Sequence, residues 1–322
     1  MTMILAIGNS GSYEVAAFKL VLEELGRRGE NAILFKQDKC LEDDYLTFEV
    51  IDGKPRYFVV IDNVKYDTDI FSTVWYMHPH LPRELLQYEP AEHRQFIHRQ
   101  FDEMGRALWT LLSHKKWIND SWTAFAAENK IYQLCVAVEC GFTVPNTLIT
   151  SSPDQVRDFF ETHSRDIIVK LFAASPILDH VVYTNRVKPE QMDNIDSVRF
   201  SPSIFQANIP KGYELRITVV GDRIFPVKIL SQQDEETAVD WRRKPKLNDF
   251  DVKMEPTVLP EEVVSKIFSF MKKMELKYGC IDMIVTPSGE YIFLEVNPNG
   301  QWYFVQLRTN MEIAKAIADL LI

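Results

Sequence analysis

The sequence predicts a mixed α/β (α+β) fold made of three domains. An apolar run at residues 3–7, followed by a glycine-containing turn and a helical pattern, indicates an α/β domain at the N-terminus. Paired apolar segments around Gly221-Asp222 and Ser288-Gly289 indicate antiparallel hairpins in the C-terminal third. The length of 322 residues exceeds one compact unit. We expect domains at residues 1–120, 121–203 and 204–322.

Apolar runs and helical spacing alternate along the first domain. Gly8 and Gly11 follow the first strand, but the third glycine of a dinucleotide fingerprint and the lysine of a phosphate-binding loop are missing, which favours a structural turn. His93 and His98 are five residues apart and do not share a helix face, which favours solvated residues over ligands. The predicted strands are 3–7, 32–35 and 71–76, with a meander at 46–66 and helices at 14–28 and 90–113.

The second and third domains show clear start and stop residues. Gly141 can end a helix in the left-handed conformation, and Ser152-Pro153 is a cap followed by proline at the first helical position. Residues 231–257 are polar and contain Trp241-Arg242-Arg243-Lys244, the one basic and aromatic cluster of the chain. The predicted helices are 123–139, 153–160, 260–276 and 311–322, and the predicted strands are 147–150, 166–171, 215–220, 224–230, 281–285 and 291–296.

Composition restricts the possible partners. The formal net charge of −10 repels a phosphate backbone and an anionic membrane surface, so no nucleic-acid or membrane partner is expected. The four cysteines form no CxxC pair, and no signal peptide or long apolar segment is present. These features predict a cytoplasmic protein. Any phosphate it handles must be held by a few placed cations, helix termini or metal ions.

A pair of opposed carboxylates is the strongest chemical feature. A hairpin that turns at Ser288-Gly289 places Asp282 directly across from Glu295, and Asn297 shares their face. The two acids repel unless one is protonated, the pair is solvated or a cation lies between them, and oxygen ligands of this kind select Mg²⁺. The alternative is a sheet face wetted at one end. The apolar neighbours on both strands favour the metal site, because buried carboxylates require partners.

Three isolated cations lie near strand ends or helix starts. Lys130 follows Asn129, Lys170 closes a strand, and Arg216 lies in a β-branched strand on the same face as Glu214. A fixed guanidinium in such a strand can hold a carboxylate or phosphate with two hydrogen bonds. The alternative for Arg216 is a surface pair with Glu214, worth about 0–1 kcal/mol.

The order of these motifs resembles the ATP-grasp fold, with an N-terminal α/β domain, a small central domain and a C-terminal antiparallel-sheet domain. Within that fold the chain is similar to the ATP-grasp ribosomal peptide maturases, the graspetide or microviridin-type ligases, from about residue 117 to the end. The motifs that carry the resemblance are Asn129-Lys130, Ile-Ile-Val-Lys170, Phe-Gln206-Ala-Asn-Ile, Glu214-Leu-Arg216, Val-Asp240-Trp-Arg242, Ile-Asp282-Met-Ile and Leu-Glu295-Val-Asn297-Pro.

The resemblance implies a role for each of these residues. Lys130 and Lys170 would hold the ATP phosphates, the segment Gln206, Ala207, Asn208 and Ile209 would contact adenine, and Glu214 would accept the ribose hydroxyls. Asp282, Glu295 and Asn297 would hold Mg²⁺ between the β and γ phosphates. Arg216 would steady an acyl phosphate, and Arg242 would lie near the acidic core of the peptide substrate. The loop after Lys170 lacks glycine, so phosphate contact by its backbone is less expected than in glycine-rich loops.

The implied substrate is a ribosomal precursor peptide with a leader and a core. An Asp or Glu side chain of the core would be phosphorylated by ATP and then captured by Thr or Ser as an ω-ester, or by Lys as an ω-amide. The alternatives are a glutamate ligase of the RimK type, which adds amino acids to a protein tail, and a non-catalytic nucleotide-binding module. The resemblance also implies a homodimer.

Overall fold

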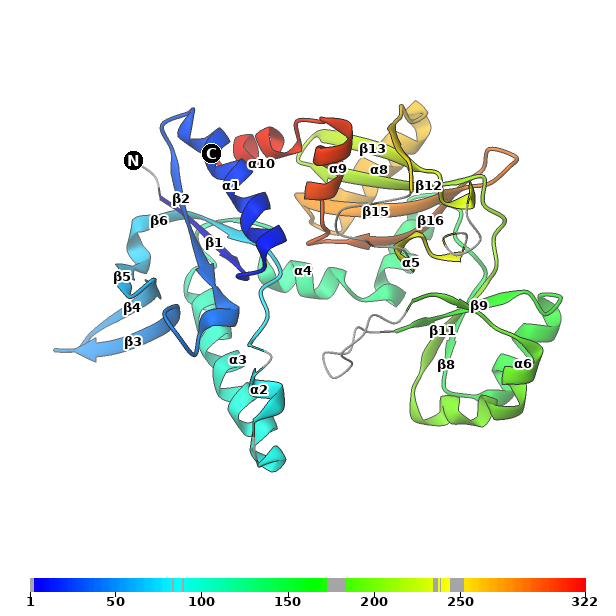
Figure 1. Ribbon diagram of the computed structural model, residues 1–322, viewed down its shortest axis with the longest axis horizontal. Helices are drawn as coiled ribbons and strands as arrows, with labels where there is room; N and C mark the ends of the chain where they lie inside the picture. The colour runs from blue at the N-terminus through cyan, green and yellow to red at the C-terminus, as the bar shows by residue number, and fades with distance from the viewer. Residues whose placement is uncertain are drawn as a thin grey trace.

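The computed structural model describes residues 3–82, 84–88, 90–172, 183–233, 237, 239–243 and 252–322. Within these ranges the strands form four sheets. Figure 1 shows the N-terminal elements on the left, a C-terminal sheet at the upper right and a central sheet below it. The expected mixed α/β architecture is therefore confirmed. Most of the glycine-free loop after Lys170 lies outside the described residues.

The N-terminal domain contains a parallel sheet with the order β2-β1-β6-β7. Its strands are short apolar runs that are largely buried, as parallel strands covered on both faces require. A second, antiparallel sheet of the order β3-β4-β5 forms the predicted meander, with Asp52-Gly53 and Asp62-Asn63 in the left-handed conformation at its turns. The elements are β1 (Met3–Gly8), α1 (Ser12–Gly26), β2 (Asn31–Lys36), β3 (Tyr45–Ile51), β4 (Lys54–Ile61), β5 (Val64–Asp67), β6 (Phe71–Tyr76), α2 (Glu84–Gln87), α3 (Arg94–Leu111) and β7 (Lys116–Ile118).

The predicted helix at 123–139 is in fact two helices, α4 (Ser121–Ala127) and α5 (Lys130–Glu139). The Asn129 side chain accepts hydrogen bonds from the backbone N–H groups of Ile131 and Tyr132, so it caps α5 and interrupts the helical pattern. Lys130 consequently occupies the first position of α5. Gly141, with φ +78°, ends α5 as expected.

The central sheet has the order β10-β9-β11-β8 and is covered by α6. Ser152 caps α6, and Pro153 occupies its first position. The strand β11 lies at the boundary expected near residue 203, but it pairs with β8 and β9 and so belongs to this sheet. The elements are β8 (Thr147–Thr150), α6 (Pro153–Thr162), β9 (Ile167–Leu171), β10 (Asn185–Arg186) and β11 (Ser203–Ala207), with a 3₁₀ segment at Pro189–Phe200.

The C-terminal sheet is antiparallel, with the order β14-β13-β12-β15-β16. Gly221, with φ +60°, makes the tight turn between β12 and β13. Figure 1 shows α4 and α5 running beneath β16, between the N-terminal and central domains. The elements are β12 (Tyr213–Val220), β13 (Arg223–Ile229), β14 (Met254–Pro256), α8 (Glu261–Lys273), β15 (Tyr278–Val285), β16 (Tyr291–Asn297), α9 (Tyr303–Thr309) and α10 (Ile313–Leu321).

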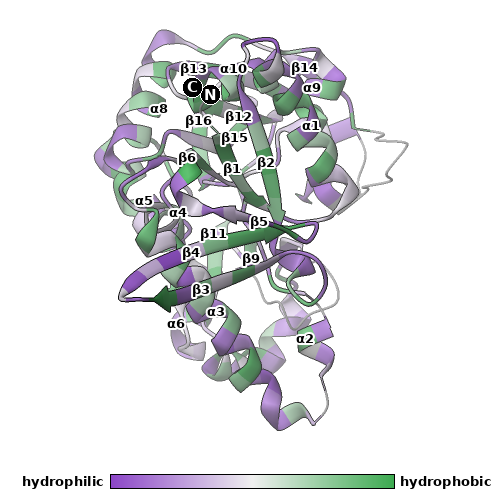
Figure 2. Cartoon of the chain, turned by 90° about the vertical axis from the view of Figure 1, so that its left-hand side faces the viewer, coloured by the Kyte–Doolittle hydropathy of each residue, from purple (hydrophilic) through white to green (hydrophobic). Residues whose placement is uncertain are grey.

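One hydrophobic core joins the two ends of the chain. Buried side chains of β1 and α1, such as Ile4 and Val21, pack in the same cluster as Trp302 and Ile317 from the C-terminal segment. Figure 2 shows hydrophobic residues along β1 and β2 and mixed polarity on the surrounding helices. Among the described residues, no helix is both long enough and apolar enough to cross a bilayer.

Candidate active site

Three charged residues lie in a row across one face of the C-terminal sheet. Arg216 on β12 pairs with Asp282 on β15, and Asp282 pairs with Glu295 on β16. Because directly paired residues project to the same face of a sheet, the two carboxylates and the guanidinium are neighbours. The predicted juxtaposition of Asp282 and Glu295 is therefore present.

The register of this hairpin differs from the predicted one near its turn. Met283 pairs with Phe293, so β16 carries one extra residue, Leu294, opposite the step from Asp282 to Met283. This β-bulge shifts the pairing by one residue, and the Asp282 to Glu295 pair depends on it. The loop between the strands is correspondingly wider than two residues, with Gly289 in the left-handed conformation.

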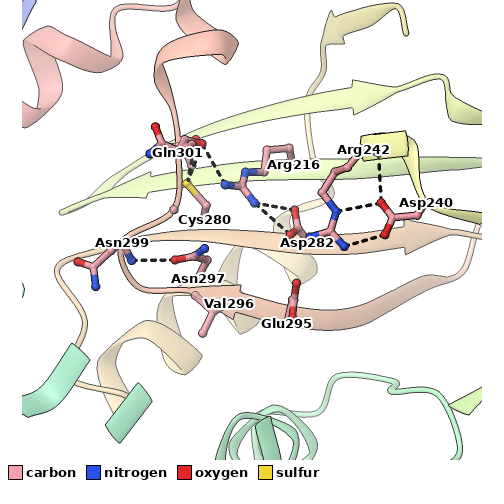
Figure 3. Close-up of polar contacts among 12 residues, drawn as sticks. Arg216, Asp240, Arg242, Cys280, Asp282, Glu295, Val296, Asn297, Asn299 and Gln301 are labelled. Atoms are coloured by element: carbon pink, nitrogen blue, oxygen red, sulfur yellow. Dashed lines mark hydrogen bonds and ion pairs between the residues drawn. The ribbon is translucent and has the colours of Figure 1, made fainter. Parts of the chain in front are cut away.

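Arg216 holds Asp282 and not Glu214. Its Nη1 donates to both carboxylate oxygens of Asp282, at 3.1 and 3.0 Å, and its Nη2 donates to the Gln301 carbonyl at 2.9 Å (Figure 3). The alternative of a surface pair between Arg216 and Glu214 is wrong, because the Arg216 side chain is only 8% exposed and is directed to Asp282. Burial raises the pKa of Asp282, and Arg216 opposes that shift.

Lys130 holds the second carboxylate. Its Nζ lies 2.7 Å from Oε2 of Glu295. Burial alone would raise the pKa of Glu295, but the nearby charges of Lys130 and Lys170 outweigh it and lower that pKa to about 2. Burial lowers the pKa of Lys170. The negative charge of Glu295 partly offsets this shift, and the positive charges of Lys211 and Lys130 add to it. The candidate residues Lys130, Lys170 and Glu295 are thus brought to one place from three separate elements.

Asn297 follows on β16, two residues after Glu295 and across from Cys280. Its Oδ1 accepts a hydrogen bond from the backbone N–H of Asn299 at 3.0 Å. In the described ranges no three His, Cys, Asp or Glu side chains gather as a metal site. A divalent cation here would therefore rely on the two carboxylates together with the Asn297 amide oxygen, which is a donor set that suits Mg²⁺. Without a metal, the positive charges beside the two carboxylates come from Lys130, which contacts Glu295, and Arg216, which contacts Asp282.

Glu214 and the hinge residues surround this row. The Glu214 carboxylate accepts hydrogen bonds from Ser231 Oγ at 2.8 Å and Lys211 Nζ at 3.1 Å, and burial raises its pKa. Gln206 donates to Thr147 Oγ1, while its own Oε1 is buried without a partner among the described residues.

The hinge backbone is partly used within the protein itself. The N–H groups of Ala207 and Asn208 donate to the carbonyls of Asn146 and Asp166, at 2.9 and 3.1 Å. Backbone hydrogen bonds to a bound base would therefore have to come from other groups of this segment, such as those of Ile209.

Arg242 is held beside the carboxylates by a buried acid. Its Nε and Nη2 donate to the two oxygens of Asp240, at 2.9 and 2.7 Å, and Asp240 also accepts from the Thr184 N–H at 3.2 Å. Burial would raise the pKa of Asp240, but the hydrogen bonds and charge of Arg242 lower it to about 2. Figure 3 shows Arg242 between Asp240 and Asp282, so the predicted substrate residue does lie at the site. Lys244, from the same basic cluster, lies outside the described residues.

A small cavity of about 30 Å³ lies between the carboxyl ends of the N-terminal strands and the segment after β16. Gln301, which lines it, also accepts the hydrogen bond from Arg216. The lining residues are Glu14, Ala17, Trp75, Tyr76, Met77, Tyr278, Asn299, Gly300, Gln301 and Trp302.

Other buried contacts at the site were not predicted as functional. Gln133 and Asn119 bind backbone groups of β16 and of the residue after it, and Asp240 positions Arg242. Asp240 belongs to the Val-Asp240-Trp-Arg242 motif quoted above and lies two residues from Arg242. The contact of Gln133 with Val296 spans 163 residues, so local patterns carry no signal of it.

The candidate site thus combines paired carboxylates on an antiparallel sheet, two converging lysines and a buried arginine. The RimK-like ATP-grasp domain matches residues 127–321, and the chain belongs to this family of ATP-grasp ligases. No curated protein matches the chain.

Among solved structures, the chain is similar over its full length to ATP-grasp ligases that act on or bind peptides. A RiPP-associated ATP-grasp ligase from Chryseobacterium gregarium, solved with ADP and a leader and core peptide, is 29% identical with a TM-score of 0.86, over 100% of this chain and 96% of the other. The macrocyclase MdnC from Microcystis aeruginosa MRC, bound with precursor peptide MdnA, is 28% identical with a TM-score of 0.86, over 100% and 99%. The macrocyclase MdnB of that organism is 27% identical with a TM-score of 0.81, over 100% and 99%. The chain is thus an ATP-grasp ligase structurally close to peptide macrocyclases.

Proposed function

We propose that this chain is an ATP-dependent peptide ligase that phosphorylates Asp or Glu side chains of a ribosomal precursor peptide and closes ω-ester or ω-amide crosslinks within it. The single observation that carries the proposal is the row of Glu295, Asp282 and Arg216 on one sheet face, which Lys130 of α5 completes through its contact with Glu295. Two adjacent carboxylates with a cation at each end provide ligands for a metal and cations for phosphate. The likeness to macrocyclases over the full chain supports a peptide substrate.

In this proposal each cation of the site takes part in phosphate binding. Lys130 leaves Glu295 when nucleotide enters and, with Lys170, contacts the phosphates. Asp282, Glu295 and Asn297 would hold Mg²⁺, which when bound neutralises charge on the β and γ phosphates. Glu214, already held by Ser231 and Lys211, would accept the ribose hydroxyls. Gln206, Ala207, Asn208 and Ile209 would contact the base.

The reaction requires two transfers. A carboxylate oxygen of the core attacks the γ-phosphorus, the bond to the β-phosphate oxygen breaks, and ADP leaves. A Thr or Ser hydroxyl, or a Lys amine, then attacks the acyl carbon, loses its proton, and inorganic phosphate leaves. In the proposal Arg216 binds the acyl phosphate, because a planar guanidinium matches its oxygens, and Arg242 binds the acidic core of the peptide. Each crosslink removes one water from the peptide.

The test is incubation with ATP, Mg²⁺ and the peptide encoded next to the gene, with ADP and peptide mass measured together. ADP release with a loss of about 18 mass units per link, the mass of one water, supports crosslinking. A mass gain per turnover would instead indicate a ligase of the RimK type, and nucleotide binding without turnover would indicate a non-catalytic module. A homodimer remains a prediction, and light scattering of the purified protein measures it directly.

A further inference from the structure

The metal-carrying strand β16 is an edge strand. In the order β14-β13-β12-β15-β16 it has a strand neighbour on one side only. The outer backbone groups of an edge strand must find other partners if they are buried. Glu295 and Asn297 both project from this strand. The groups that hydrogen-bond to its outer backbone therefore also fix the backbone positions of these two residues.

Gln133 of α5 satisfies the edge at the residue between them. Its Oε1 accepts a hydrogen bond from the Val296 N–H at 3.0 Å, and its Nε2 donates to the Val296 carbonyl at 2.9 Å. The same Nε2 donates to the Ala127 carbonyl at 2.6 Å. Gln133 is 1% exposed, so water does not compete for these bonds. One side-chain amide thus binds both backbone groups of Val296, as a neighbouring strand would.

Asn119 holds the chain on the other side of Asn297. Its Nδ2 donates to the carbonyls of Pro298 and Tyr278, both at 2.8 Å. Its Oδ1 accepts from the N–H groups of Lys277 and Tyr278, at 2.8 and 3.0 Å. Asn119 is 2% exposed and uses its whole hydrogen-bonding capacity in this way. The residues before and after Asn297 are therefore both fixed by buried amides.

The same turn of α5 also holds a metal-site side chain. Lys130, three residues before Gln133, contacts Glu295 at 2.7 Å. Residues three apart lie on one face of a helix, and Asn129 fixes the start of that helix with its cap. A single helical turn consequently sets both the side chain of Glu295 and the backbone that follows it.

We propose that Gln133 and Asn119 are positioning residues of the metal site, whose amides take the place of a missing strand and fix the β16 backbone from which Glu295 and Asn297 project. The inference rests on the proposed function in one respect, that the site binds a divalent cation with the nucleotide. Mg²⁺ requires near-ideal octahedral geometry, at about 2.0–2.1 Å from its ligands, so a small shift of this backbone weakens binding.

The test compares the native protein with Gln133→Met, which keeps the size of the side chain and removes all three hydrogen bonds. Mn²⁺ replaces Mg²⁺, and free Mn²⁺ is measured by electron paramagnetic resonance during titration of the protein–ADP complex. We expect about 10–100-fold weaker Mn²⁺ binding in Gln133→Met, as for other residues that orient metal ligands. The affinity for ADP without metal should be unchanged.

The matched control is Tyr57→Phe, which deletes a buried hydrogen bond to the Met104 carbonyl in the N-terminal domain. It should lower the unfolding temperature and leave Mn²⁺ binding unchanged, which separates positioning from general destabilisation. If Gln133→Met does not fold, Gln133→Asn keeps the amide but retracts it by one methylene, and the same weakening is expected. Native Mn²⁺ affinity in the folded variant overturns the inference, whereas absence of Mn²⁺–ADP binding by the native protein overturns the proposed function.

Discussion

Replacing Gly300 with alanine should disable the site through Arg216. Gly300 lies shortly after β16, and its carbonyl accepts a hydrogen bond from the Tyr278 hydroxyl at 2.5 Å. A Cβ at this position would lie 2.5 Å from Cys280 Cβ and 2.8 Å from Arg216 Nη2. Gly300 is therefore required by the close approach of the chain to the strand and to the arginine, and not by a left-handed backbone.

The size of the effect follows from these distances. Non-bonded carbon atoms approach to about 3.5 Å, so a Cβ at 2.5 Å forces a displacement of about 1 Å. Cys280 is fully buried in the sheet, so the loop and the Arg216 side chain must absorb most of the shift. Overpacking of this kind costs about 1–3 kcal/mol of stability. A misplacement of about 1 Å at a reacting group can reduce the rate about 100-fold.

The assay is ADP formation with the precursor peptide, together with thermal unfolding of the same sample. Gly26→Ala is the matched control, because a Cβ at Gly26 meets nothing within 4 Å. We expect the control to keep native activity. A Gly300→Ala protein with the rate and unfolding temperature of the control would refute the steric reasoning.

Three other changes test the charged row and its surroundings. Glu295→Gln should abolish turnover, and because Lys130 and Lys170 lower the pKa of Glu295 to about 2, it should also reduce the unfolding free energy, by about 1–3 kcal/mol after allowing for solvent exposure; an active variant would exclude the metal role. Arg216→Lys should lower kcat about 100-fold, since a point charge cannot replace the planar fork, and a near-native rate would remove Arg216 from the acyl-phosphate site. The pKa of Asp240 is lowered to about 2, so its pairing with Arg242 stabilises the fold by about 2 kcal/mol above about pH 4, and this stabilisation is lost as the pH falls towards 2. In urea unfolding at pH 3 and 6, Asp240→Asn should lose less unfolding free energy on acidification than the native protein, and equal losses would contradict the pairing.

The central feature of the site could be predicted from the sequence because it is local to a hairpin. Asp282 and Glu295 are close in the chain, and the alternation of strand side chains together with a turn at Ser288-Gly289 was enough to oppose them. The turn itself is wider than predicted, and the bulge at Leu294 restores the pairing. The wider loop shifts the pairing by one residue, and the bulge shifts it back, so the predicted pair is correct although the predicted turn is not. A bulge leaves no distinct pattern in a single sequence and could not be predicted.

The partners of these acids could not be predicted from local patterns. Whether Arg216 turns to Glu214 or to Asp282 depends on which strand lies beside β12, and sequence spacing alone favours neither. The break at Asn129 was missed because a single Asn within an apolar periodicity is tolerated in a helix as well as being a good cap. Long-range contacts such as Gln133 to Val296 depend on the packing of whole domains, which hydrophobic periodicity does not specify.

The covering of β16 limits how the protein can be divided. The matched family domain begins at residue 127, after Asn119. A fragment cut at that point keeps Gln133 but loses the amide that holds the Pro298 carbonyl, and it also loses the helix α1 that packs beside Trp302. Its unprotected strand edge and apolar surface would recruit other copies into aggregates. Soluble, catalytically useful fragments should therefore retain the N-terminal domain together with Asn119.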